Sequence, residues 1–138
     1  MTASYLVDTS AFARYGLKPV KHVLDPLLEA GGVATCSVVV MELLFSARSA
    51  ADMKATRGDL RQALDLIPTN QANFDRAIEV MQALSDNGLH RAAPLPDLLI
   101  AAVGEAAGLE IIHYDEDFDL ISRVTGQPVR WVAPKGSL

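Results

Sequence analysis

The stretch Ile111-Ile112-His113-Tyr114-Asp115-Glu116-Asp117-Phe118 decides the fold that we predict for this chain. Its apolar start is long enough for one buried strand, and three consecutive acidic residues follow. In a parallel α/β sheet, ligands bind outside the carboxyl ends of the strands, so Asp115 and Asp117 stand where a functional site is expected. The chain opens with a second junction of this kind, Tyr5-Leu6-Val7 followed by Asp8.

The rest of the chain alternates short apolar runs with helical patterns, which is typical of βαβ units. We predict strands at residues 4–7, 33–36, 110–113 and 129–132, with a short edge strand or extended link at 65–68. We predict helices capped by Thr9 or Ser10 and by Ser37, with further helices at 20–30, 50–64, 70–86, 95–103 and 116–123. The length of 138 residues suits one domain spanning residues 1–138.

Three helical segments carry patterns whose consequences are less direct. Val38–Val40 also suits a strand, but we prefer a helix because Ser46-Ala47-Arg48 continues the helical pattern. The stretch 50–64 predicts an exposed amphipathic helix, whose apolar face either docks a partner or packs on the core. In the next helix, one predicted apolar stripe consists of Phe74, Ala77, Ile78, Met81 and Leu84.

Charge and cysteine content exclude some classes of protein. The net charge of −5, from 12 Lys and Arg against 17 Asp and Glu, argues against simple electrostatic wrapping of nucleic acid. The single Cys36 cannot form an internal disulfide and is expected to be a buried, reduced thiol. No apolar stretch reaches the roughly 20 residues of a membrane span. We therefore expect a cytoplasmic protein without membrane contact.

Two carboxylates lie on otherwise apolar helices. Glu42 shares a helical face with Val39 and Phe45, and Asp97 shares one with Ile100. An unpaired buried carboxylate costs several kcal/mol, so such residues are rare unless paired or bound to a metal. Lys and Arg are scarce around these positions, which points to a bound cation.

A plain structural role carries about equal weight for two of the acidic residues. Asp8 is also placed to cap the first helix. Asp97 follows Pro96 and is also suited to the first turn of a helix, where the helix dipole favours negative charge. For Glu42 no such alternative is at hand.

The chain resembles the PIN-domain ribonucleases, in particular the VapC-type toxins of bacterial VapBC toxin-antitoxin pairs. Four motifs in the right order and spacing carry this resemblance across nearly the whole chain. They are Val7-Asp8-Thr9-Ser10-Ala11, Val40-Met41-Glu42-Leu43, Leu95-Pro96-Asp97-Leu98-Leu99-Ile100-Ala101-Ala102 and His113-Tyr114-Asp115-Glu116-Asp117-Phe118-Asp119-Leu120-Ile121.

The resemblance implies a three-layer α/β/α fold with a four- or five-stranded parallel sheet and metal-dependent RNA cleavage. It implies that Asp8, Glu42, Asp97 and Asp115 form the catalytic acidic quartet, and that Asp117 is a fifth carboxylate. Carboxylate oxygens in such numbers select Mg²⁺ or Mn²⁺. We expect the metal on the four aspartates Asp8, Asp97, Asp115 and Asp117.

Further residues are assigned with the same resemblance in view. Ser10, or Thr9, falls where the family keeps a hydroxyl near the metal. His113 departs from the family's Thr or Ser, and a core or rim position is favoured over one in the site. We expect Ser10, Arg14 and Arg91 to contact RNA. Other candidates for phosphate contacts are Arg48, Arg57 and Arg61.

The resemblance also implies partners, and two alternatives stay open. The expected partners are RNA, a VapB-type antitoxin that blocks the site, and a second copy of the chain in a homodimer. One alternative is a catalytically silent PIN-like binding module. The other is an acidic receiver-type signalling domain, which needs a Lys after a late strand, where this chain has only Lys135.

Overall fold

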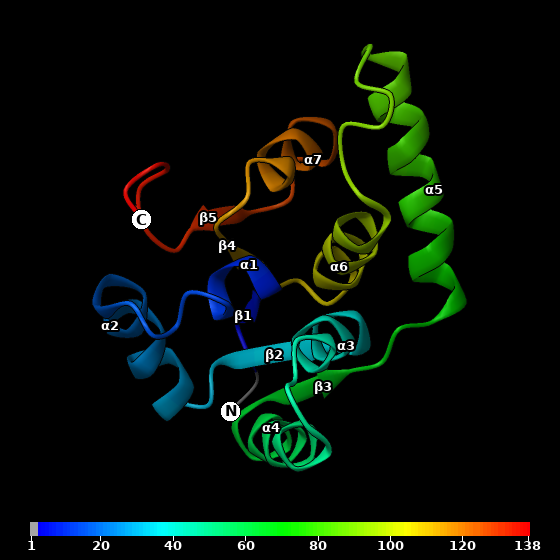
Figure 1. Cartoon of the computed structure of the whole chain (residues 1–138). Helices are drawn as coiled ribbons and strands as arrows, with labels where there is room; N and C mark the ends of the chain where they lie inside the picture. Colours follow the sequence, from blue (N-terminus) through cyan, green and yellow to red (C-terminus); the bar gives the residue numbers. More distant parts are fainter. Residues whose placement is uncertain (1–2) are drawn as a thin grey trace.

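The computed structural model describes residues 3–138 and has a five-stranded sheet at its centre (Figure 1). Every pair of neighbouring strands is parallel, in the order β3-β2-β1-β4-β5. The strands are β1 (Tyr5–Val7), β2 (Val33–Cys36), β3 (Asp65–Ile67), β4 (Glu110–His113) and β5 (Val129–Trp131). The prediction of a four- or five-stranded parallel sheet is confirmed, and the segment at 65–67 is an edge strand rather than a link.

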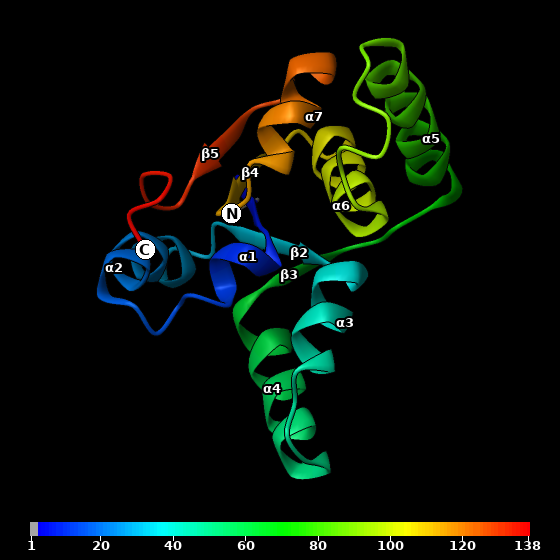
Figure 2. The same cartoon turned by 45° about the horizontal axis from the view of Figure 1, so that its top comes forward.

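Helices cover both faces of the sheet, which confirms the predicted three-layer α/β/α arrangement (Figures 1 and 2). Successive strand residues point to opposite faces, so Leu6 and Ile111 enter one core while Val7 and Ile112 enter the other. The helices are α1 (Thr9–Phe12), α2 (Lys18–Glu29), α3 (Ser37–Phe45), α4 (Ala50–Ala63), α5 (Gln71–Asp86), α6 (Leu95–Ala106) and α7 (Asp117–Thr125). In Figure 2, α3 and α4 run side by side and project beyond the sheet.

The order of the strands creates one natural ligand site. From β1 the chain proceeds to β2 and β3 on one side, and β4 and β5 lie on the other side of β1. Val7 pairs with Ile112, and the backbone N–H of Asp8 donates to the carbonyl of Ile112 at 2.8 Å. In open α/β sheets, ligands bind at the carboxyl ends of the two strands where the order reverses. In this fold those strands are β1 and β4.

Helix α6 reaches that position because it packs closely on the sheet. A Cβ atom added at Gly104 would overlap the side chain of Ile111 in β4. Only glycine therefore allows this close approach. The approach fixes α6, whose first turn carries Asp97, against the strand that leads into Asp115.

The structure corrects the predicted ends of two helices. Asp8, rather than Thr9 or Ser10, is the N-cap of α1, because its side chain accepts the backbone N–H of Ser10. Ser37 does not cap α3 either: it is the first helical residue, and no side chain caps this end. The same helix stops at Phe45 instead of continuing to Arg48.

The predicted apolar stripe of α5 is only partly buried. Ala77 and Leu84 are buried, but Phe74, Ile78 and Met81 are 47%, 63% and 44% exposed. The buried stripe of α5 is instead Asn73, Ala77, Val80 and Leu84. A periodic pattern shows that a helix has an apolar side, but the width of the buried strip depends on the neighbour against which it packs.

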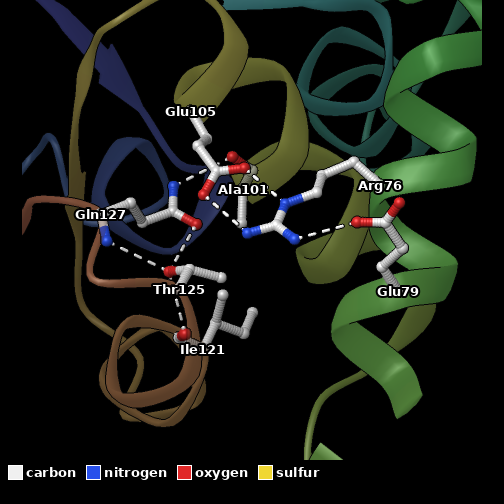
Figure 3. A network of polar contacts seen from close by, with 7 residues as sticks. All are labelled: Arg76, Glu79, Ala101, Glu105, Ile121, Thr125 and Gln127. Atoms are coloured by element: carbon white, nitrogen blue, oxygen red, sulfur yellow. Dashed lines mark hydrogen bonds and ion pairs between the residues drawn. The ribbon is translucent and has the colours of Figure 1, made fainter. Parts of the chain in front are cut away.

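A polar network joins α5, α6 and the end of α7 (Figure 3). Arg76 binds both carboxylate oxygens of Glu105, at 2.7 and 3.2 Å, and one oxygen of Glu79 at 3.1 Å. The amide of Gln127 donates to the carbonyl of Ala101 at 2.9 Å. Each charge in this network faces an opposite charge, so the network fastens the helices that cover one face of the sheet. Within residues 3–138, no helix is long and apolar enough to cross a lipid bilayer.

Candidate metal centre

Asp8 comes directly after β1, and its two carboxylate oxygens have different surroundings. Oδ2 accepts hydrogen bonds from the backbone N–H of Ser10 at 2.9 Å and from its hydroxyl at 2.6 Å. Oδ1 is buried and has no hydrogen-bond partner. Burial raises the pKa of Asp8 although these hydrogen bonds act against it, and repulsion from Glu42 adds to the rise. Asp8 therefore caps a helix and also presents an oxygen to the site.

Two hydroxyl groups of α1 hold acidic residues of other segments in place. The Ser10 hydroxyl donates to Asp8 and accepts the backbone N–H of Tyr114 at 2.9 Å, which ties the end of β1 to the end of β4. The Thr9 hydroxyl donates to Oε1 of Glu42 at 2.8 Å, which ties α1 to α3. The sequence led us to expect one hydroxyl near the site. The structure has two: Ser10 binds Asp8, and Thr9 binds Glu42. The Ser10 hydroxyl donates its one proton within the chain, and its role as an RNA contact stays a prediction.

Asp97 lies in the first turn of α6, as its sequence position suggested, but it does not cap that helix. The N-cap is Pro94, and no side-chain cap is present. Asp97 is 8% exposed, and its Oδ2 is buried without a hydrogen-bond partner. Burial first, and then repulsion from the other acidic residues of the site, raises its pKa to about 8. The helix dipole is therefore not the dominant influence on this carboxylate.

Asp115 and Asp117 lie on the turn that connects β4 to α7. The backbone N–H of Asp117 donates to Oδ1 of Asp115 at 3.0 Å, so the turn is closed by the side chain of its own first acidic residue. Burial and the neighbouring Asp115 raise the pKa of Asp117. Asp97, Asp115 and Asp117 each offer one carboxylate oxygen, and these three oxygens lie within 4.8 Å of one another.

The five carboxylates converge from four separate segments and repel one another. Asp8, Asp115, Asp117 and Glu42 all contribute to the raised pKa of Asp97. Among residues 3–138, none of the five forms an ion pair with a Lys or Arg. Two buried oxygens without partners and three oxygens grouped around one point match what a hard divalent cation requires. The donor set therefore fits Mg²⁺ or Mn²⁺.

A sequence comparison identifies the family. The profile of the PIN domain matches residues 5–124. This chain belongs to the PIN-domain family. Over 137 residues it is 43% identical to "Ribonuclease VapC21" of Mycobacterium tuberculosis, with 99% of each chain covered. It is 40% identical to "Ribonuclease VapC51" of the same species over 138 residues, which is 100% of this chain and 99% of that protein. The predicted resemblance is confirmed.

Solved structures place the same PIN fold in protein complexes. VapBC2 from Rickettsia felis, solved bound to a DNA fragment from its promoter, contains a similar chain with a TM-score of 0.76 at 17% identity, covering 95% of this chain and 98% of that one. A toxin-antitoxin complex from Klebsiella pneumoniae gives 0.73 at 22% identity, with coverage of 94% and 98%. At these identities the likeness establishes the fold alone.

The two arginines predicted to bind RNA are far from equivalent in this PIN domain. Arg14 lines a cleft to which Asp115 also contributes, and one of its N–H groups donates to the carbonyl of Ser10 at 2.8 Å. Arg91 lies on the loop before α6, with a φ of 62°, and lines a hollow to which none of the five carboxylates contributes. Arg14 is therefore next to the acidic site, whereas the position of Arg91 lends no support to its predicted role.

His113 is a core residue, as predicted, and it contacts the backbone of the acidic site. It is fully buried, and its Nδ1 accepts the backbone N–H of Asp115 at 3.1 Å. Its Nε2 lies 3.7 Å from Oδ1 of Asp119, whose other oxygen accepts the indole N–H of Trp131 at 3.0 Å. No role was predicted for Asp119 or Trp131, although Asp119 belongs to the acidic motif that follows His113.

Glu42 lies on α3 at the margin of the site. It lines a groove of about 310 Å³ together with Val38 and Met41 of its own helix and with residues of the start of α6. Phe45, which shares its predicted packed face, is 92% exposed. That part of the prediction is wrong: the end of α3 projects beyond the sheet beside α4 (Figure 2), and the Phe45 side chain stays exposed there.

The receiver-type alternative finds no support at Lys135. The Lys135 ammonium pairs with Glu116 at 2.6 Å, and both side chains are exposed. It forms no ion pair with the carboxylates of the acidic site, as a receiver domain would require. The family assignment excludes this alternative.

Proposed function

We propose that this chain is a metal-dependent endoribonuclease and the toxin of a type II toxin-antitoxin pair, hydrolysing RNA phosphodiester bonds. The observation that carries the proposal is the convergence of five carboxylates near the ends of β1 and β4, with two buried oxygens and, among residues 3–138, no ion pair to a Lys or Arg. Its PIN-domain relatives are named VapC ribonucleases. The expected cellular location, where RNA is available, is the cytoplasm.

The proposed metal ligands are Asp8, Asp97, Asp115 and Asp117. Mg²⁺ is the proposed physiological ion, and Mn²⁺ is expected to replace it because both prefer oxygen ligands. When bound, such an ion supplies Lewis-acid chemistry: it neutralises the phosphodiester and lowers the pKa of a water ligand. No residue of the chain has to act as a nucleophile.

The other side chains of the site keep the carboxylates in position. Ser10 holds one oxygen of Asp8, which leaves the other oxygen directed into the site. Thr9 fixes Glu42, which we propose as the fourth catalytic carboxylate, at the margin where it accepts a proton from the attacking water. His113 fixes the backbone of Asp115. Preorganised groups of this kind avoid reorganisation during the reaction.

The overall negative charge does not oppose RNA binding at this site. Subtracting the five carboxylates from the 17 acidic residues leaves 12, which equals the number of Lys and Arg. One or two divalent ions would offset two to four of the five negative charges in the site. Arg14, beside Asp115, is the arginine best placed for a phosphate contact.

The proposed protein partner is a VapB-type antitoxin, and α4 supplies a surface for it. Four helices border a groove of about 530 Å³, whose apolar lining includes Phe12, Leu43 and Leu60. Within α4 no residue is fully buried, and Leu60 is only partly buried where it packs against the core. Solved complexes of similar fold contain antitoxins with their toxins. Leu60→Arg is expected to abolish co-purification of the antitoxin without loss of RNA cleavage.

A homodimer stays a prediction, and the exposed apolar side chains suggest where it would form. Met41 and Leu95 are 70% and 68% exposed and line the same groove beside Glu42. Exposed apolar surface of this kind often marks an interface. Sedimentation of the purified chain would show the dimer, and Leu95→Glu should convert it to a monomer.

Mapping of new RNA ends in cells tests the proposed function. Expression of the wild type should create new ends at defined sites in cellular RNA, and expression of Asp8→Asn to the same level should not. If both proteins leave the RNA intact, the chain is a silent PIN-like binding module. If both proteins create the same ends, the acidic site is not the site of cleavage.

A further inference from the structure

The cleft that Arg14 and Asp115 line opens directly beside the acidic residues. It has a volume of about 420 Å³, and Asp115 forms part of its wall, so it is continuous with the proposed metal centre. The other lining residues are Arg14, Tyr114, Glu116, Trp131, Lys135, Gly136 and Leu138. Two aromatic rings and two cationic side chains in one cleft are an unusual combination for a net acidic protein.

The aromatic groups of this cleft form a fixed platform. The rings of Tyr114 and Trp131 meet edge to face, with centroids 5.3 Å apart and an interplanar angle of 84°. The Arg14 guanidinium lies 4.6 Å from the centre of the Tyr114 ring and is held there by the carbonyl of Ser10. Proteins that bind single-stranded RNA stack its bases on such rings and guanidinium planes.

The polar groups of the cleft match the backbone of the same ligand. Lys135 lies 6.0 Å from the centre of the Trp131 ring, and its present partner Glu116 is as exposed as Lys135 itself, at 62%. Exposed ion pairs contribute little stability, so exchanging this carboxylate for a phosphate costs little. Asp115 does not repel the phosphate once a divalent ion neutralises it.

We infer that this cleft is a nucleoside subsite, which binds by stacking the nucleotide next to the scissile phosphate while Arg14 and Lys135 contact the RNA backbone. The inference rests on the proposed ribonuclease function and adds what that function leaves open, namely how an RNA strand is held beside the metal. Because stacking tolerates any base, such a platform predicts a preference for single strands more than for one sequence.

The chain provides its own probe for this subsite, because Trp131 is its only tryptophan. The experiment uses the Asp8→Asn protein with Mg²⁺, so that RNA binds without being cleaved. The fluorescence of Trp131 is followed while a short single-stranded RNA of mixed sequence is added, and again with an abasic strand of equal length and charge. The RNA should quench the fluorescence and bind about tenfold more tightly than the abasic strand, as expected from the stacking of one base.

Two variants separate stacking from charge. Arg14→Lys keeps the charge that contacts the backbone but removes the plane, so it should weaken binding of the RNA several-fold more than binding of the abasic strand. Arg130→Lys is the matched control and should change neither, because its guanidinium also lies over a tyrosine ring, 5.0 Å from the centre of Tyr5, but outside the cleft. Lys135→Gln should weaken both strands equally and reduce the salt dependence of binding by about one charge. Unchanged melting temperatures would exclude misfolding as the cause.

Different experimental results would overturn this inference and the proposed function. Equal affinity for RNA and the abasic strand, or equal effects of Arg14→Lys on both, would overturn the nucleoside subsite even if the wild type cleaves RNA. A wild type that does not cleave RNA in Mg²⁺ would overturn the proposed function, whatever the fluorescence shows.

Discussion

Two polar regions of this PIN domain contain acidic side chains, and these side chains have different partners in the two regions. In the network of Figure 3, Glu105 faces Arg76 through two hydrogen bonds, and the pKa of Arg76 is raised by its carboxylate partners. At the ends of β1 and β4, burial first and then repulsion from the other carboxylates raises the pKa of Asp97 to about 8. The first region satisfies its charges within the chain, and the second does not.

This difference separates structural from functional polar groups. Unpaired buried charge lowers the stability of the folded state, so it is found mainly at sites where a bound ligand offsets this cost. Carboxylates that have a strongly raised pKa and no cationic partner are therefore a better guide to the site than the mere presence of acidic residues. Variants in either region should therefore affect RNA cleavage and stability to different extents.

The largest effect is expected on RNA cleavage. Asp8→Asn, Asp97→Asn and Asp115→Asn should each lower the rate by at least about a hundredfold, because a bound metal contributes several kcal/mol to the transition state. Combining two of these changes should add little, since residues of one metal centre act as a unit. Rates are measured with a fluorescent RNA substrate. Additive losses in the double variants would indicate independent roles instead.

The next effect is on stability as a function of pH in EDTA. The pKa of Asp97 is raised from 3.8 to about 8, so the folded state holds this proton more tightly than the unfolded chain. The free energy of unfolding of the wild type should therefore fall as the pH rises from about 4 to about 8, by a few kcal/mol. Asp97→Asn removes this contribution, so at pH 8 its metal-free form should melt above the wild type. A variant that melts below the wild type at pH 8 would show that Asp97 acts as a helix-start residue.

Added metal should stabilise the wild type in thermal melting. An ion that binds only the folded state contributes about 2.7 kcal/mol at a hundredfold excess over its dissociation constant, which corresponds to several degrees for a domain of this size. The shift with Mn²⁺ should shrink in Asp97→Asn. Glu105→Gln, which changes the same charge in the satisfied network, should keep the full shift.

The smallest effect is expected from breaking that network. Glu105→Gln leaves Arg76 without its bidentate partner, and the pair is only partly buried, so the free energy of unfolding should fall by about 1 kcal/mol. Glu79→Gln, at the more exposed partner of the same arginine, should cost less. Cleavage of RNA should be normal in both, and a large loss of activity in Glu105→Gln would remove the distinction between the two regions.

Much of the fold and of the acidic cluster could be predicted from the sequence. The strands are short apolar runs with sharp ends, and parallel pairing brings the residues after β1 and β4 to one edge. Asp8 and Asp115 therefore had to be neighbours once the sheet was predicted. The position of Asp97 followed from its place at the start of an apolar helix and from the family resemblance. That the chain is one domain stays a prediction.

Features that depend on packing between distant segments could not be predicted. A hydrophobic pattern does not say whether Phe45 or Ile78 faces the core or a partner, because both faces of α3 and α5 carry apolar residues. The support of Asp115 by His113 requires the register of β4 and β5, which brings Trp131 beside His113. The sequence offered Asp8, Thr9 and Ser10 as caps of the first helix, and the backbone angles that decide for Asp8 are not dictated by residue type.

The most direct measurement is RNA cleavage by the purified chain before and after removal of metal. In EDTA the wild type should lose nearly all activity, and added Mg²⁺ or Mn²⁺ should restore it, while Asp115→Asn should stay inactive under all three conditions. This result would show that the carboxylates at the ends of β1 and β4 work through a divalent ion. Full cleavage of RNA in EDTA by the wild type, with no gain on adding metal, would contradict the account.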